Sequence, residues 1–221
     1  MIVDERIRTY INSLEKTNSR LLEDIEQKAH KDGVPIIRKE MESFLRVMLL
    51  IKKPTKILEL GTAVGYSAIL MSECIEKDAK IVTIENYGRR IKEAKENIKK
   101  ADREKTIELL GGDAMEIMPT LVEEQFDFVF MDAAKAQYIN FLPQVLRLMK
   151  KGAILITDNV LQEGDLIESK FVVRRRDRTI HKRMREYMEV VKNHPELETS
   201  IVPIGAVSYT HLRAHETLRY L

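Results

Sequence analysis

Five short apolar runs, rich in β-branched and aromatic residues, alternate with amphipathic stretches of ten or more residues between Lys56 and Thr157. Runs that are apolar on both faces are typical of parallel strands covered by helices on each side. A regular strand–helix alternation with right-handed crossovers predicts a doubly wound α/β sheet. Gly152, which follows Lys150 and Lys151, is expected to end the helix before the fifth strand. The expected strands are 57–60, 81–84, 107–110, 126–131 and 153–157.

The first 53 residues have a helical period instead. Apolar side chains recur at a spacing of three or four within 7–14, 21–25 and 41–49. We therefore expect residues 1–53 to form a helical cap that belongs to the same domain as the core, residues 54–205.

Composition narrows the class of protein. Of the 221 residues 44% are hydrophobic, which excludes a disordered chain. The 37 Lys and Arg nearly balance the 35 Asp and Glu, so the whole chain has too little net charge to attract a polyanion. The single cysteine, Cys74, fits a reducing compartment. The charged N-terminus and the shortness of the apolar runs predict neither export nor a membrane span, so we expect a cytoplasmic protein.

Glycines and acids follow the first three strands at what should be one edge of the sheet. The first strand leads through Glu59 into a turn with the spacing G-x-x-x-G, Gly61 to Gly65, which does not match the dinucleotide fingerprint G-x-G-x-x-G. Glu85 ends the second strand, where a carboxylate can accept both hydroxyls of a ribose, and Asp113 follows the third. Each feature alone also suits an ordinary turn or a solvated strand end. Together they predict a site for a nucleoside-bearing cofactor.

Acidic and amide side chains follow the fourth and fifth strands. Asp132 and Lys135 come after one strand, Asp158 and Asn159 after its expected neighbour. Two carboxylates placed together repel unless a cation lies between them, and an all-oxygen set suits a hard ion such as Mg²⁺. The alternative is that these acids only cap the helices that follow.

The ordered motifs resemble those of the cation-dependent O-methyltransferases of the class I S-adenosylmethionine (SAM) type, the catechol and caffeoyl-CoA relatives. They read ELGTAVGYSA, GGDA, FVFMDAAK and ITDN, with Glu85 between the first two, and the resemblance covers about residues 30–205. It implies a seven-stranded, mostly parallel, Rossmann-like methyltransferase sheet, a homodimer, and bound SAM and Mg²⁺. It places Lys135 as the catalytic residue and Asp132, Asp158 and Asn159 as metal ligands. The cofactor contacts that it implies are Ile37, Glu59, Gly61, Gly65, Ser67, Glu85, Asp113, Ala114 and Asp132.

A strongly basic stretch, residues 170–185, follows the fifth strand and should border the mouth of this site. Its arginines suit phosphate contacts, although a charge run is often only a solvated helix face. With the opening residues it resembles the bacterial branch of the family that methylates 5-hydroxyuridine at the wobble position of the tRNA anticodon loop, giving 5-methoxyuridine. Competing interpretations are a small-molecule catechol-type enzyme and a non-catalytic RNA-binding protein. The residues expected to bind RNA are Arg174, Arg175, Arg176, Arg178, Lys182 and Arg183. Tyr138, Phe171 or Tyr187 could stack on the base, but each also suits the core.

The last sixteen residues, 206–221, do not resemble the ending of the family. Residues 207–217 look like translated sequencing-adapter DNA, so we predict a non-native tail and an altered final strand. Val207 and Tyr209 still alternate as in a strand, which leaves a substitute edge strand open.

Overall fold

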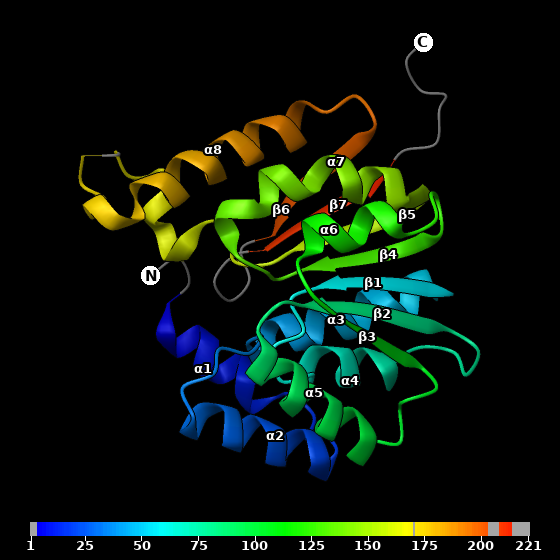
Figure 1. Ribbon diagram of the computed structural model, residues 1–221. Coiled ribbons are helices and arrows are strands. Elements are labelled where there is room, and N and C mark those ends of the chain that lie inside the picture. Colours follow the sequence, from blue (N-terminus) through cyan, green and yellow to red (C-terminus); the bar gives the residue numbers. More distant parts are fainter. Residues whose placement is uncertain (1–3, 170, 203–207, 214–221) are drawn as a thin grey trace.

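The computed structural model describes residues 4–169, 171–202 and 208–213. A sheet with the strand order β3-β2-β1-β4-β5-β7-β6 forms its centre, and helices cover both faces (Figure 1). The α/β class predicted from the alternating pattern is confirmed. The strands are β1 Lys56–Leu60, β2 Lys80–Glu85, β3 Ile107–Gly111, β4 Phe126–Met131, β5 Met149–Thr157, β6 Leu197–Val202 and β7 Ser208–Arg213.

The five predicted strands pair in parallel, from β3 through β2, β1 and β4 to β5. β7 then pairs antiparallel with both β5 and β6 and completes the edge. The chain builds the sheet outward from β1 in one direction and from β4 in the other. The strand order therefore reverses between β1 and β4, and a crevice at their carboxyl ends is the usual ligand site of such sheets.

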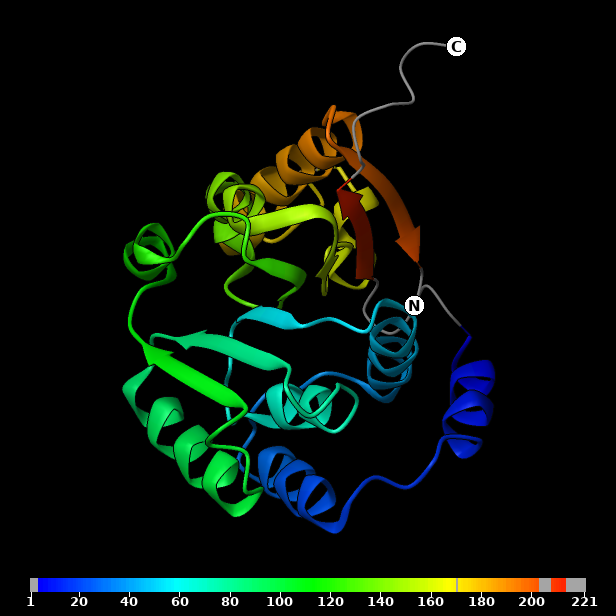
Figure 2. The same cartoon turned by 90° about the vertical axis from the view of Figure 1, so that its right-hand side faces the viewer.

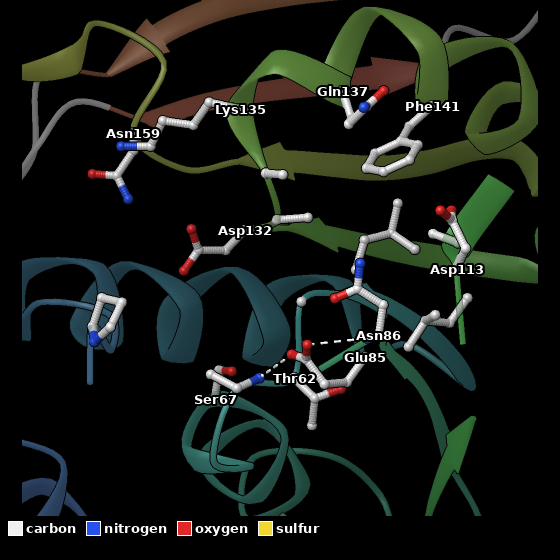
Figure 3. A pocket seen from close by; sticks show the side chains of 18 of the residues that line it. Thr62, Ser67, Glu85, Asn86, Asp113, Asp132, Lys135, Gln137, Phe141 and Asn159 are labelled. Atoms are coloured by element: carbon white, nitrogen blue, oxygen red, sulfur yellow. Dashed lines mark hydrogen bonds between the residues drawn. The ribbon is translucent and has the colours of Figure 1, made fainter. Parts of the chain in front are cut away.

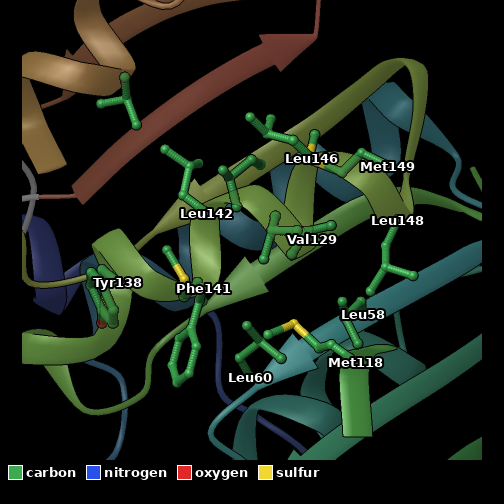
Figure 4. Close-up of a cluster of buried hydrophobic side chains, with 14 of the residues drawn as sticks. Leu58, Leu60, Met118, Val129, Tyr138, Phe141, Leu142, Leu146, Leu148 and Met149 are labelled. Carbon is green, nitrogen blue, oxygen red and sulfur yellow. The ribbon is translucent and has the colours of Figure 1, made fainter. Parts of the chain in front are cut away.

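Alternate residues of each strand enter two different hydrophobic clusters. In β1, Ile57 faces helices α2–α5 and Leu58 faces α7 and α8, and both side chains are fully buried. Figure 1 shows α6, α7 and α8 on one side of the sheet, and Figure 4 shows the cluster that α7 covers. The helices are α1 Glu5–Ser13, α2 Arg20–Lys31, α3 Lys39–Lys52, α4 Tyr66–Ser72, α5 Gly88–Lys100, α6 Ala114–Ile117, α7 Tyr138–Leu148 and α8 Arg178–Asn193.

The three helices expected before residue 53 are present. Leu22 and Ile25 of α2 and Leu45 and Leu49 of α3 are buried in the cluster with Ile57. Figure 2 shows α1 further from the sheet, on the side where β6 and β7 lie. The residues between α2 and α3 cross toward the carboxyl ends of the strands, where they become part of the site described below.

The expected helix end at Gly152 is wrong. Helix α7 ends at Leu148, and Lys150, Lys151 and Gly152 belong to β5. The register with β4 passes from Phe126–Met149 to Phe128–Ile154, so residues 150–153 oppose only Asp127. Gly152 has a φ of 72°, which a bulge of this kind favours. Glycine after two lysines marks either a helix end or a bulge, and the local sequence does not distinguish them.

Part of the predicted tail is a strand, since residues 208–213 form β7 and pair with β5 and β6. Its remaining residues, 206, 207 and 214–221, lie outside the described residues. Within the described chain, no helix has both the length and the apolar character needed to cross a membrane.

Candidate active site

A cavity of about 540 Å³ opens at the carboxyl ends of β1 to β5. Its wall combines the segments that follow these strands with the loop between α2 and α3, and Figure 3 shows the side chains around it. Nine of the predicted site residues therefore meet around one space. They are Ile37, Gly61, Ser67, Glu85, Asp113, Ala114, Asp132, Lys135 and Asn159.

The glycine turn after β1 brings two backbones unusually close. Gly61 has a φ of 98°, and its N–H donates to the carbonyl of Ile84 at 3.0 Å. A Cβ at this position would overlap the carbonyl oxygen of Asp132, so only glycine fits. Gly65, with a φ of 85°, caps the start of α4 and is not among the residues that line the cavity. The first glycine provides space beside β4, and the second provides the turn into the helix.

Glu85 is held rigidly at the end of β2. One carboxylate oxygen accepts from the N–H of Ala63 at 2.8 Å, and the other accepts from the N–H of Asn86 at 3.0 Å (Figure 3). The second oxygen also accepts from the N–H of Tyr87 at 2.9 Å. The same side chain lines the cavity. Asp113 lines the next part of the wall and caps α6 through the N–H of Met115 at 2.8 Å. Both acids are thus fixed in orientation before any ligand binds.

Glu59, which we expected to contact the cofactor, lies behind the wall and is fully buried. Its carboxylate accepts from the hydroxyl of Ser67 at 2.5 Å and from the hydroxyl of Thr83, which also pairs with Thr62. Burial raises the pKa of Glu59 to about 7, although the hydrogen bonds from Ser67 and Thr83 act in the opposite direction. Glu59 therefore orients two residues of the wall, Ser67 and Thr62, rather than touching a ligand.

The predicted metal ligands come together as the sheet register requires. The N–H of Asp132 donates to Leu60, and that of Asp158 donates to Met131, each continuing a parallel ladder past the end of its strand. Asn159 has a φ of 59°, and its N–H donates to a carboxylate oxygen of Asp158 at 2.6 Å. Asp132 and Asn159 line the cavity (Figure 3), whereas Asp158 lies just behind them with 5% of its surface exposed.

The donor chemistry of these residues fits a hard divalent cation. Burial and the nearby charge of Asp158 raise the pKa of Asp132 to about 7, against the opposing effects of Lys135 and Asn159. Two desolvated carboxylates are thus held together at a cost that a cation would offset. In the described part of the chain, no group of three or more His, Cys, Asp or Glu side chains gathers into a metal site. The predicted set has only two carboxylates, with an amide as the third ligand.

Several residues of the wall were not predicted. Thr62 and Tyr66 lie within the glycine motif, so the motif itself was the available signal. Phe141 lies on the apolar face of α7 with 5% exposure, and its spacing is that of a core residue. The unpredicted lining residues are Pro35, Ile36, Leu60, Thr62, Ala63, Tyr66, Ile84, Asn86, Gly112, Met115, Ala133, Ala134, Gln137 and Phe141.

The basic stretch lies beside this site, but its charges are not equivalent. A guanidinium N–H of Arg183 donates to the carbonyl of Ala136 at 3.1 Å, which joins α8 to the segment that carries Lys135. Arg174 and Arg176 lie 3.0 and 3.6 Å from the carboxylate of Asp177. Arg178 donates to the carbonyl of Val173 at 3.2 Å. Arg175 and Lys182 are exposed.

A second, more open cavity of about 1080 Å³ lies along the start of α8. Arg178, Lys182, Arg183 and Arg185 line it together with Phe171, which is 75% exposed. Of the three aromatic residues considered for base stacking, Tyr138 and Tyr187 are fully buried, and their rings pack edge to face with centroids 5.7 Å apart. Phe171 alone of the three can present its ring to a ligand.

Comparison with known proteins adds independent information. The family model described as O-methyltransferase matches residues 12–211. A catechol O-methyltransferase of Niastella koreensis is 34% identical over 57% of this chain and 58% of its own length. A catechol O-methyltransferase of Mycobacterium tuberculosis is 28% identical over 68% of this chain and 66% of its own. The aligned part thus spans less than two thirds of either relative.

Among solved structures, a Staphylococcus aureus protein provisionally named caffeoyl-CoA O-methyltransferase superimposes with a TM-score of 0.88. It is 27% identical, and the match covers 96% of this chain and all of that one. The likeness therefore extends over the cavity, the strands that carry it and the N-terminal helices.

Proposed function

Because this chain belongs to the O-methyltransferase family, we propose that it transfers the methyl group of SAM to a hydroxyl oxygen held beside a divalent cation. One observation carries the proposal. Asp132, Lys135 and Asn159 share the wall of one cavity with the glycine turn and Glu85. This shared wall supports a donor site for a nucleoside next to a site for an activated hydroxyl.

The chemistry needs an ionised acceptor. A phenol-like hydroxyl with a pKa of about 10 is largely protonated at pH 7, and ionising it at that pH costs about 4 kcal/mol. A bound cation would reduce this free-energy cost by lowering the pKa of a coordinated hydroxyl. Asp132, Asp158 and Asn159 would hold that cation, and Lys135, as the neutral amine, would accept the hydroxyl proton at Nζ. In the transfer, the C–S bond of the sulfonium breaks and an O–C bond forms, leaving a thioether.

For the acceptor we propose RNA, specifically the 5-hydroxyuridine of a tRNA anticodon loop, converted to 5-methoxyuridine. The support is the basic rim around Arg175, Lys182 and Arg183, together with the exposed ring of Phe171 in the second cavity. Phosphate contacts by arginine and lysine with an aromatic platform for a base are the usual features of single-strand binding. The 5-hydroxyl with its neighbouring carbonyl can chelate a cation as a catechol does.

The test is incubation of the protein with SAM, Mg²⁺ and tRNA that contains 5-hydroxyuridine, followed by mass spectrometry of the nucleosides. We expect a gain of one methyl group on that nucleoside and a tRNA affinity that falls as salt rises. The Lys182→Ala variant should weaken tRNA binding, whereas Lys105→Ala, before β3 at the opposite edge of the sheet, should not.

A second candidate acceptor is a small catechol-type molecule, favoured by the names of the two catechol O-methyltransferases. It predicts turnover of free catechol without salt-sensitive binding. If catechol is methylated and tRNA is not, the RNA acceptor is wrong and this candidate stands. A non-catalytic RNA-binding protein would bind tRNA without binding SAM or its demethylated product, S-adenosylhomocysteine (SAH).

We also propose a homodimer, as the family resemblance implies. Helix α1, its C-cap residue Leu14 and helix α3 expose apolar side chains that a single copy leaves in solvent. They include Tyr10 and Leu14 at 65% each, Leu50 at 62% and Ile51 at 71%. Several large exposed apolar side chains on neighbouring helices suit an association site.

A further inference from the structure

A buried polar network lies on the outer side of the cavity wall, and neither the cofactor contacts nor the proposed chemistry uses it. Its centre is Tyr66, the first residue of α4, which lines the cavity and is 2% exposed. The Tyr66 hydroxyl donates to a carboxylate oxygen of Glu42 at 2.7 Å. Burial and this acceptor raise the pKa of Tyr66, so the hydroxyl keeps its proton and remains a donor.

Glu42, in the first turn of α3, is 4% exposed and collects further partners. Its second carboxylate oxygen accepts from the amide of Asn18 at 2.8 Å. The ammonium of Lys39 lies 3.1 Å from Glu42 and 2.7 Å from Glu26 of α2. Burial alone would lower the pKa of Lys39, but its hydrogen bond to Glu26 and the charge of Glu42 outweigh that effect and raise it. The lysine therefore stays charged between two acids.

The network joins both sides of one end of the cavity. Pro35, Ile36 and Ile37, in the loop between α2 and α3, line this cavity, and α3 begins with Lys39 two residues later. Tyr66 lines it from the α4 side. Glu26, Lys39 and Glu42 thus anchor the helices on each side of the loop and connect them to Tyr66. Glu42 and Tyr66 are buried, so breaking the bond between them leaves desolvated polar groups, whereas Lys39 and Glu26 are partly exposed.

We propose that Glu42 is a positioning residue for the cofactor: through the Tyr66 hydroxyl it holds the loop 35–37 and the start of α4 at the separation that SAM binding requires. This inference rests on the proposed function, because it concerns the affinity of the cavity for SAM. It is independent of which acceptor is methylated.

The test measures the affinity for SAH by calorimetry in wild type, Glu42→Gln, Tyr66→Phe and the double variant. Each single change should weaken binding about tenfold, because Tyr66→Phe deletes a buried hydrogen bond to a charged group and Glu42→Gln replaces the charged acceptor by a neutral amide. The double variant should be no weaker than the worse single variant, because the Tyr66 hydroxyl is proposed to act on the cavity only through Glu42. The KM for SAM should rise while kcat changes little.

Tyr187→Phe is the matched control. Tyr187 is fully buried in α8, and its hydroxyl lies 2.8 Å from that of Thr157, so the change deletes a similar hydrogen bond away from the loop 35–37. We expect unchanged SAH affinity in this variant. Hydrogen exchange adds a readout besides binding. The amides of Met41 and Ile69, which donate to Arg38 and Gly65 at the starts of α3 and α4, should exchange faster in Glu42→Gln and not in Tyr187→Phe.

The possible outcomes separate clearly. Wild-type affinity in both Glu42→Gln and Tyr66→Phe, or an equal loss in Tyr187→Phe, overturns the positioning role while leaving the proposed function intact. Additive losses in the double variant also overturn it, because the two residues would then act separately. A wild-type protein that fails to bind SAH refutes the proposed cofactor itself and the positioning role with it.

Discussion

Replacing Gly61 by alanine is the sharpest single perturbation of the candidate site. Gly61 has a φ of 98°, and a Cβ placed there would overlap the carbonyl oxygen of Asp132. The same Cβ would lie 2.8 Å from the carbonyl carbon of Asp132 and 3.1 Å from Cα of Ala133. All of these neighbours are backbone atoms at the end of β4, so no side-chain rotation relieves the overlap.

Two effects add in this variant. Left-handed backbone at a residue with a Cβ costs about 1 kcal/mol, and forcing an extra carbon into a packed region costs about 1–3 kcal/mol more. We therefore expect the free energy of unfolding to fall by about 2–4 kcal/mol. Relief of the overlap requires Asp132 to move by roughly 1 Å, and a displacement of that size at a reacting centre can reduce kcat/KM about 100-fold.

The controls are two other glycines with positive φ. Around Gly65, at φ 85°, the nearest atoms to an added Cβ are those of Ala94 at 3.5 Å, and around Gly33, at φ 64°, nothing lies within 4 Å. In both alanine variants the free energy of unfolding should fall only by the roughly 1 kcal/mol that left-handed backbone costs. Urea unfolding and steady-state kinetics with SAM measure the two effects separately. If Gly61→Ala and Gly65→Ala lose the same activity, close packing of Gly61 against Asp132 is not what the site requires.

Three further changes test other parts of the structure. Asp158→Asn should weaken Mg²⁺ binding at least tenfold by calorimetry and make methyl transfer need far more Mg²⁺; unchanged Mg²⁺ dependence would remove Asp158 from the metal site. Glu59 has a pKa of about 7 in the folded chain against 4.5 for the free side chain, so its contribution to stability is complete below pH 4.5 and is lost as pH rises to 7. Between pH 5 and pH 8 the wild type should lose about 2.5 kcal/mol of unfolding free energy through this group, measured by urea unfolding in chelator. Glu59→Gln should not show that loss, and an equal pH dependence in the two proteins would contradict this. Leu50→Lys, on the exposed face of α3, should convert the proposed homodimer to monomers in light scattering, and a variant that stays dimeric would place the interface elsewhere.

The parallel strands could be predicted because burial on both faces leaves a simple signal. Phe126–Met131 is apolar at five of six positions, and its bounds in the structure match the prediction. At Gly152 the local sequence permits both a helix end and a bulge, and only pairing with β4 selects the bulge. Element type was thus decided by local pattern, whereas the exact start of β5 was decided by contacts distant in sequence.

The residues of the candidate site also divide into those that the local sequence predicts and those that depend on contacts distant in sequence. Asp132 and Asn159 could be predicted to meet because strands β4 and β5 are neighbours and their ends lie at one edge. The position of Glu59 could not be predicted, because strand alternation directs it toward α4 and Ser67 and not toward the cavity. The pair of Glu42 and Tyr66, 24 residues apart, depends on how α3 packs against α4 and has no local signature.

The two carboxylates at the ends of β4 and β5 are best explained by chemistry, because they oppose folding. Asp158 is 5% exposed, and its charge adds to the burial that raises the pKa of Asp132. Hydrogen bonds from Asn159 reduce this cost, but a neutral pair would avoid it. In metal-free protein, removing one of the two charges therefore relieves repulsion, while in the presence of Mg²⁺ the same change removes a ligand. Opposite effects of Asp158→Asn on unfolding with chelator and with Mg²⁺ would show that the acids are retained for cation binding, and a loss of stability in both conditions would show that they serve the fold.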